Sequence, residues 1–181
     1  QGTLDPSSTS NLVPSCGGVA GAQAIAYLVH LPEPKVMIAT TNGSTVNTVL
    51  TLRGANCQDS QAEIACNDNI SSGNNASSIT TSLAAGSYYL IVSGATVAAT
   101  GDYALDVKFF TGEGEMCVDT EECGPGLVCR TPLGETDMQC AQPVCNDGID
   151  DDGDGKIDYP ADPGCASADD DDESDDCPDG P

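Results

Sequence analysis

The sequence predicts a mainly β protein, in which an antiparallel β-sandwich is followed by a disulfide-rich C-terminal extension with a calcium loop. Three observations lead to this prediction. Short segments of alternating apolar and polar residues, separated by Gly, Asn and Ser, recur through residues 21–110. No segment sustains the 3.6-residue period of an amphipathic helix. The ten cysteines and the absence of tryptophan indicate that the remainder relies on covalent links more than on a large core.

The predicted strands follow a polar, Ser/Thr/Pro-rich stretch at residues 1–15, which we expect to be extended. In the first strand, Ala24–Leu31, alternate residues from Ile25 to Leu31 share one face. The other strands are expected at Val36–Thr41, Thr48–Arg53, Ala62–Cys66, Ser78–Leu83, Ser87–Ser93 and Asp102–Phe110. Seven short strands joined by turns are typical of an antiparallel β-sandwich.

Five features of this region have a recognisable order and spacing: Asn47–Leu50, Cys57, Ala65–Asp68, Ala85–Val92 and Gly101–Leu105. Together they resemble the bacterial pre-peptidase C-terminal domain, over about residues 12–110. The resemblance implies a jelly-roll-like β-sandwich that secreted proteases and other exported proteins use for targeting, adhesion or substrate contact. It also implies a calcium site at Asn47, Asp68 and Asn69, although the family often has aspartate where Asn47 stands.

The chain changes character after this region, and the composition predicts four parts: 1–15, 16–111, 112–144 and 145–181. Residues 112–144 are rich in Gly, Glu and Pro and show almost no periodicity. So short a stretch buries too little apolar surface to fold unaided, so disulfides must replace the core. The segment Glu122–Cys129 is similar to small cysteine-rich secreted modules. Of the three possible pairings, we expect the interleaved one, Cys117–Cys129 with Cys123–Cys140.

The other cysteines are assigned by proximity in the sequence. Cys57 and Cys66 would pair across a short loop, and Cys145–Cys165 would close the acidic stretch between them. Cys16 and Cys177 remain, and they either join the two ends of the molecule or link neighbouring molecules. We expect all ten cysteines to be oxidised, which indicates a secreted or cell-surface protein. Sequons at Asn42, Asn69 and Asn75 permit glycosylation.

Residues 150–158 follow the pattern Asp-x-Asp-x-Asp-Gly-x-x-Asp, which predicts a calcium-binding loop. Calcium takes about six to eight oxygen ligands, and alternate residues of a tight loop can point to one centre. The expected ligands are the carboxylates of Asp150, Asp152, Asp154, Asp158 and Asp162 and the backbone carbonyl of Lys156.

Asp162 would replace the bidentate glutamate that an EF-hand has one position earlier, where this chain has Ala161. Pro160 and Pro163 exclude a flanking helix, so the loop is EF-like without an EF-hand. It resembles the loops of thrombospondin type-3 repeats and dockerins. The stretch Cys145–Cys165 also resembles a cysteine-bracketed motif of secreted proteins from Gram-negative bacteria. The acidic run Asp169–Asp176 has two interpretations. It is either a solvated acidic tail or a further part of the metal site.

The net charge of −24 is concentrated at the C-terminal end, where residues 145–181 hold fifteen acidic residues and one basic residue. Such a charge disfavours nucleic acid and anionic lipid, and no apolar run is long enough for membrane insertion. No nucleophile–base motif is present, and the single histidine, His30, lies on a predicted strand. We therefore expect a protein that is not an enzyme and that binds calcium, itself, or other extracellular proteins or glycans.

Two functions fit these features. The first is a secreted structural or adhesive module, such as the subunit of an extracellular filament or surface layer. The alternative is a non-catalytic targeting or binding appendage of a larger secreted enzyme such as a protease.

Overall fold

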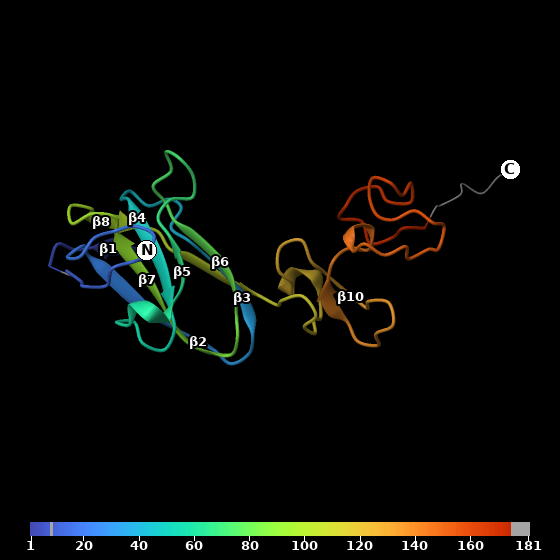
Figure 1. Ribbon diagram of the computed structural model, residues 1–181, viewed down its shortest axis with the longest axis horizontal. Helices are drawn as coiled ribbons and strands as arrows, with labels where there is room; N and C mark the ends of the chain where they lie inside the picture. Colours follow the sequence, from blue (N-terminus) through green and yellow to red (C-terminus); the bar gives the residue numbers. More distant parts are fainter. Residues whose placement is uncertain (8, 175–181) are drawn as a thin grey trace. The chain divides into compact units, whose positions relative to one another are not determined.

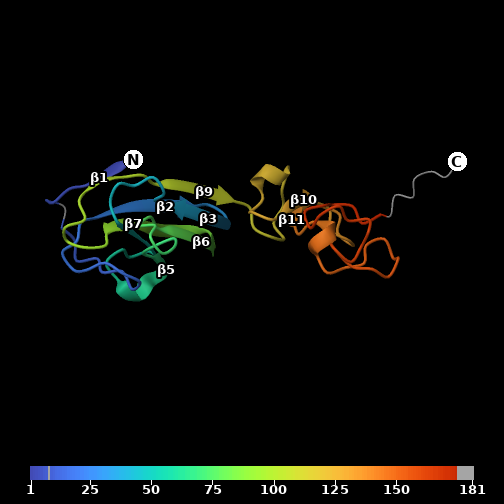
Figure 2. The same cartoon turned by 90° about the horizontal axis from the view of Figure 1, so that it is seen from above.

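A computed structural model describes residues 1–7 and 9–174 of the chain, which is drawn as a ribbon in Figures 1 and 2. The chain divides into two compact units, residues 1–109 and the residues from 110 onward. The described residues form β-strands and short 3₁₀ turns, and the turns are η1 (Ser60–Ala62), η2 (Thr120–Glu122) and η3 (Val144–Asn146). None of the described helical segments has the length and apolar character needed to cross a membrane.

The first unit is the β-sandwich that the sequence predicts. Its larger sheet has the order β2 (Ala24–Leu31), β7 (Gly86–Gly94), β4 (Thr48–Arg53) and β5 (Glu63–Asn67). Its smaller sheet has the order β6 (Ser78–Leu83), β3 (Lys35–Thr40) and β9 (Asp106–Phe110). A separate antiparallel pair joins β1 (Gly2–Leu4) to β8 (Gly101–Tyr103).

One predicted strand, Asp102–Phe110, is wrong as a continuous element. The structure breaks it at Ala104–Leu105, so that β8 pairs with β1 while β9 lies beside β3 in the smaller sheet. The alternation of apolar residues continues across the break, so it could not reveal that the two halves have different partners.

The core lies between the two sheets, because the strand alternation turns one face of each sheet towards the other. Both sheets contribute fully buried side chains, including Met37 of β3, Leu50 and Leu52 of β4, and Leu90 of β7. Burying a side chain of this size stabilises the fold by roughly 1.5–3 kcal/mol. The first unit is therefore stabilised mainly by hydrophobic burial.

The N-terminal stretch is part of this unit and differs from the extended lead-in expected for residues 1–15. Leu4 is fully buried in the core, and the β1–β8 pair uses main-chain bonds of the same chain. Further along, the carbonyl of Val13 accepts a 2.8 Å hydrogen bond from the buried guanidinium of Arg53. The stretch is held because it supplies partners that β4 and β8 would otherwise lack.

The pairing predicted for Cys57 and Cys66 is wrong, because Cys66 forms a disulfide with Cys16, 50 residues earlier. Cys66 lies on β5 directly opposite Thr51 of β4, and the N-terminal stretch reaches it where the Cys16 amide lies 3.3 Å from the Cys66 sulfur. The bridge therefore fastens that stretch to the larger sheet. It also excludes both pairings proposed between Cys16 and Cys177.

Cys57 is the free cysteine among the described residues, so the expectation that every cysteine is oxidised is also wrong. Its side chain is half-buried, and its carbonyl accepts a 2.8 Å hydrogen bond from Arg53. Cys177 lies outside the described residues.

The second unit contains one small hairpin, β10 (Val128–Arg130) with β11 (Gln139–Ala141). The disulfides among its described residues are the three pairs that the sequence predicts, Cys117–Cys129, Cys123–Cys140 and Cys145–Cys165. Apart from Pro143, the buried apolar side chains in its described part are four of these cysteines, Cys123, Cys140, Cys145 and Cys165. This unit therefore has bridges where the first has a hydrophobic core.

Candidate metal centre

The acidic loop is shaped by hydrogen bonds from its own backbone to its carboxylates. Asp150 accepts from the amides of Gly153 at 2.7 Å and Gly155 at 3.0 Å, one on each oxygen. Both glycines have a positive φ, which other residues adopt only with strain. The Asp-x-Asp-x-Asp-Gly pattern thus folds as a tight turn around the first aspartate.

The same turn brings three carboxylates together, as the sequence predicts. One carboxylate oxygen from each of Asp150, Asp152 and Asp154 lies within 4.8 Å of the other two. The Lys156 ammonium pairs with Asp154, and the Lys156 amide donates to the same carboxylate at 2.7 Å. Three like charges at this distance repel one another, and one ammonium offsets only part of that repulsion.

Asp158 has a different place from the one expected. Its carboxylate accepts hydrogen bonds from the amides of Asp147 at 3.1 Å and Gly148 at 3.0 Å. Its backbone has a φ of 54°, in the left-handed region. Asp158 therefore joins the end of the loop to the chain that precedes it, and it lies outside the three-carboxylate cluster.

Asp162 is buried, with 2% of its surface exposed. One carboxylate oxygen accepts from the Gly164 amide at 2.7 Å, and the other has no hydrogen-bond partner among the described residues. Its own amide donates to the Asp158 carbonyl at 2.8 Å, which holds it next to the end of the loop. A buried carboxylate oxygen without a partner is costly, and a cation would remove that cost.

Asp151, which the sequence analysis passed over, also has a buried carboxylate oxygen without a partner among the described residues. Burial raises the pKa of Asp151, and the negative charges of Asp147 and Glu173 raise it further. The guanidinium of Arg130 acts in the opposite direction and also pairs with Asp147. The second unit thus concentrates more negative charge than its own bases neutralise.

Glu173 is the second acidic residue that sequence reasoning missed. It is 2% exposed, although it belongs to a run of acids that has the composition of a solvated tail. Its two oxygens accept from the amides of Asp151 at 2.7 Å and Asp158 at 2.9 Å. Part of the run Asp169–Asp176 is therefore folded against the loop.

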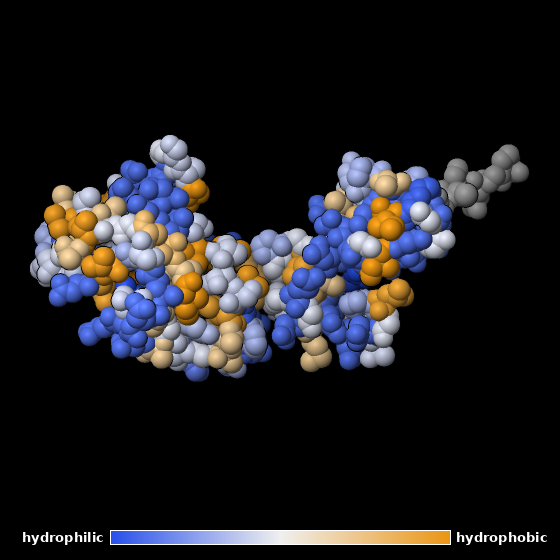
Figure 3. Space-filling view, viewed as in Figure 1, coloured by the Kyte–Doolittle hydropathy of each residue, from blue (hydrophilic) through white to orange (hydrophobic). Residues whose placement is uncertain are grey.

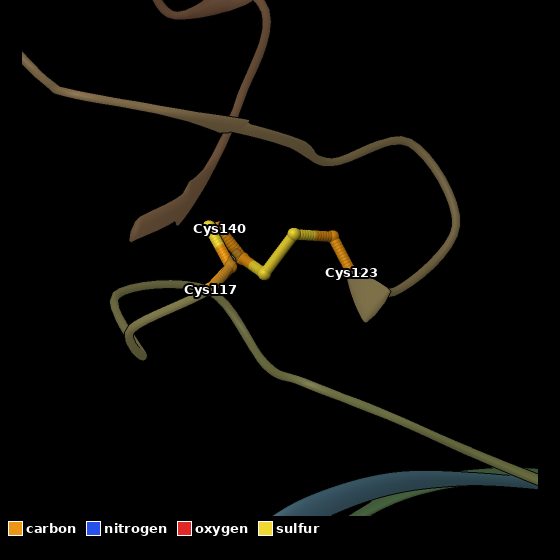
Figure 4. Close-up of side chains that lie close together, drawn as sticks. All are labelled: Cys117, Cys123 and Cys140. Carbon is orange, nitrogen blue, oxygen red and sulfur yellow. A yellow bond between two sulfur atoms is a disulfide. The ribbon is translucent and has the colours of Figure 1, made fainter. Parts of the chain in front are cut away.

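The described cysteines of the second unit offer no thiolate for a metal, since each is bonded to another cysteine. Figure 4 shows the side chains of Cys117, Cys123 and Cys140 close together, and their sulfur atoms lie within 4.8 Å of one another. However, Cys123 is bonded to Cys140, and Cys117 is bonded to Cys129. The oxygen-rich loop is therefore the metal-binding candidate of this unit. On the face shown in Figure 3, hydrophilic residues cover much of the unit.

In the β-sandwich, two of the three residues implied as calcium ligands have unusual surroundings. Asn47 and Asp68 each have a buried side-chain oxygen without a hydrogen-bond partner among the described residues. The Asp68 carboxylate also lies so close to Gly17 that only glycine fits there. A Cβ at Gly17 would lie 2.6 Å from the Oδ2 of Asp68. Asn69 is exposed. A cation site there stays a prediction.

His30 has the exposed position expected of a strand residue. It lies opposite Ser87 in the β2–β7 ladder, and its Nδ1 is 3.1 Å from the serine Oγ. This contact follows from strand register, and both side chains are exposed on the sheet.

The first unit also has an apolar groove of about 460 Å³ that the sequence analysis did not identify. It lies where β2 and β9 end their two sheets, and its lining includes Leu28, Leu105, Val107 and Phe109. Leu28 is 65% exposed. The signal in the sequence was a leucine on the strand face that otherwise carries Ala24, Ala26 and His30.

No model of a known protein family matches the chain, and no curated protein matches it. Among solved structures, the chain is similar to the pre-peptidase C-terminal domain of a collagenase from Bacillus anthracis. The two share 18% sequence identity over 55% of this chain and 100% of that chain, with a TM-score of 0.36. The assignment of a β-sandwich rests on this chain's own sheets.

Proposed function

We propose that the protein is a non-enzymatic, secreted structural or adhesive module that calcium and disulfides stabilise. The observation that carries the proposal is the buried Asp162, one of whose carboxylate oxygens has no hydrogen-bond partner among the described residues. Its amide donates to the carbonyl of Asp158, at the end of the loop that brings three carboxylates together. An extracellular location is supported by four disulfides, since such bonds persist in oxidising surroundings.

The residues fit calcium better than other common ions. The donors are carboxylate and carbonyl oxygens, which calcium accepts in large and irregular numbers, while magnesium keeps several waters and zinc favours nitrogen and sulfur. In this proposal Asp150, Asp152 and Asp154, the Lys156 carbonyl and Asp162 hold the ion, and Asp158 orients the end of the loop. The ion supplies positive charge that joins the loop to Asp162.

The proposal is tested by titrating calcium into the native chain in a calorimeter and recording its melting temperature. We expect saturable binding, and a higher melting temperature of the second unit with calcium than with chelator. Asp162→Asn should weaken binding at least tenfold, while Asp169→Asn, which removes the same charge from an exposed residue, should change it less than threefold. Native protein that binds no calcium at low salt would contradict the proposal.

A more specific hypothesis is that the protein assembles into a filament or surface layer. It is supported by β2 and β9, which are edge strands of their sheets, because an edge strand can pair with a strand of another chain. The N-terminal strand, in contrast, already pairs with β8 of its own chain. Electron microscopy and light scattering of the native protein with calcium should show assemblies, and a monomer at high concentration would exclude them.

The alternative, a binding appendage of a larger secreted enzyme, is favoured by the apolar groove between β2 and β9. An extended peptide with alternating apolar side chains fits its chemistry, because both flanking strands offer unpaired main-chain groups. Leu28→Asp should abolish binding of such peptides, while Ile64→Asp, at the exposed residue of β5, should leave binding unchanged. Equal effects of the two substitutions would argue against the groove.

A further inference from the structure

The most unexpected group in the second unit is the buried carboxylate of Glu173, which comes from the acidic run near the C-terminal end. We propose that Glu173 is a positioning residue that makes cation binding by the loop depend on docking of residues 166–174. This inference rests on the proposed calcium site, and it adds a means by which that site is assembled or released.

Glu173 spans the loop from one side to the other. Its Oε2 accepts from the amide of Asp151, which lies between two residues of the carboxylate cluster. Its Oε1 accepts from the amide of Asp158, at the end of the loop. Hydrogen bonds to a charged acceptor are roughly twice as strong as neutral ones, so this carboxylate fixes the two amides relative to each other.

The backbone around Glu173 is fitted closely to the loop. A Cβ at Gly164 would lie 1.8 Å from the Glu173 carbonyl oxygen, so only glycine allows the two segments to pass. Nearby, the Cys145 amide donates to the Asp170 carbonyl at 3.1 Å, and Cys145 is bridged to Cys165. The acidic run is therefore attached on both sides of the loop that it supports.

The consequence is a coupling between two events. If residues 166–174 detach, the amides of Asp151 and Asp158 lose their shared acceptor, and the cluster loses its fixed geometry. Because coupling between two equilibria is reciprocal, a bound cation must in turn hold residues 166–174 in place. The acidic run, through Glu173, thus controls how tightly the loop binds its cation.

The experiment compares the native chain with Glu173→Gln, Gly164→Ala and the charge-matched control Asp169→Asn. Calcium affinity is measured by calorimetry, and the melting temperature of the second unit is measured with calcium and with chelator. We expect Glu173→Gln to weaken binding at least tenfold, because its amide nitrogen would face an N–H donor. Gly164→Ala should do the same without any change of charge, and Asp169→Asn should stay within threefold.

The melting temperatures separate positioning from simple support of the fold. A purely structural role would lower the values with calcium and with chelator equally, whereas positioning reduces the increment that calcium adds. Near-native affinity in Glu173→Gln or Gly164→Ala would overturn the inference while leaving the calcium site intact. Absence of binding by the native chain would instead overturn the proposed function itself.

Discussion

The two units of this chain obtain their stability from different sources. In residues 1–109, strands of two sheets bury Met37, Leu50 and Leu90 against one another, with a single disulfide at the edge of this core. In the described part of the second unit, the buried groups are chiefly bridged cysteines and two carboxylates, Asp162 and Glu173. The first unit should therefore lose stability when apolar volume is removed from its core, and the second when its disulfides are reduced and calcium is chelated.

The largest expected effect is that of reduction. Each bridge of the second unit closes a loop with a sequence separation of 12 to 20 residues, and loops of this size are worth about 3 kcal/mol each. Reductant together with chelator should therefore unfold residues 112–174 while the β-sandwich stays folded. Hydrogen exchange followed peptide by peptide measures this, and simultaneous loss of protection in both units would contradict the comparison.

The next largest effect is destabilisation of the first unit without an effect on the second. Leu50→Ala should destabilise the β-sandwich by about 2–5 kcal/mol, because it leaves a cavity in a fully buried position. The same substitution should leave calcium affinity unchanged. Denaturant unfolding and a calcium titration of the variant measure both, with Leu133→Ala, at an exposed leucine of the second unit, as the control. A Leu50→Ala chain that bound calcium more weakly would show that the two units are not independent.

The smallest effect concerns the free thiol. Cys57→Ser should change stability by less than about 0.5 kcal/mol, since the half-buried side chain takes part in no disulfide. In the native protein, an alkylating reagent should label the peptide with Cys57 and leave those with Cys16 and Cys66 unlabelled. Mass spectrometry decides this, and a Cys57–Cys66 bridge would contradict the structure.

Most strands could be predicted because alternation reports directly on a half-buried sheet. The segments Ala24–Leu31, Thr48–Arg53 and Ser78–Leu83 have the predicted bounds. Alternation does not indicate which strands pair with one another, so the break between β8 and β9 was missed. The Cys16–Cys66 bridge was missed for the same reason, since it depends on a distant segment crossing the sheet.

The candidate site was predictable where local sequence determines geometry. Asp150, Asp152 and Asp154 come together because the pattern of aspartates and glycines forms a turn by itself. The roles of Asp158 and Glu173 depend on contacts 10 or more residues away in the chain. A run of acids has the same composition whether it is solvated or docked, so burial of Glu173 could be found only from the structure.

In the proposed function, a bound cation organises residues 145–174, which comprise the loop and the acidic run that docks against it. Hydrogen exchange of the native chain is recorded at each peptide with saturating calcium and again with chelator. We expect calcium to protect the amides of residues 145–174, those of Asp151 and Asp158 among them, and to leave exchange of residues 1–46 and 78–109 unchanged. Identical exchange of residues 145–174 in the two conditions would contradict it.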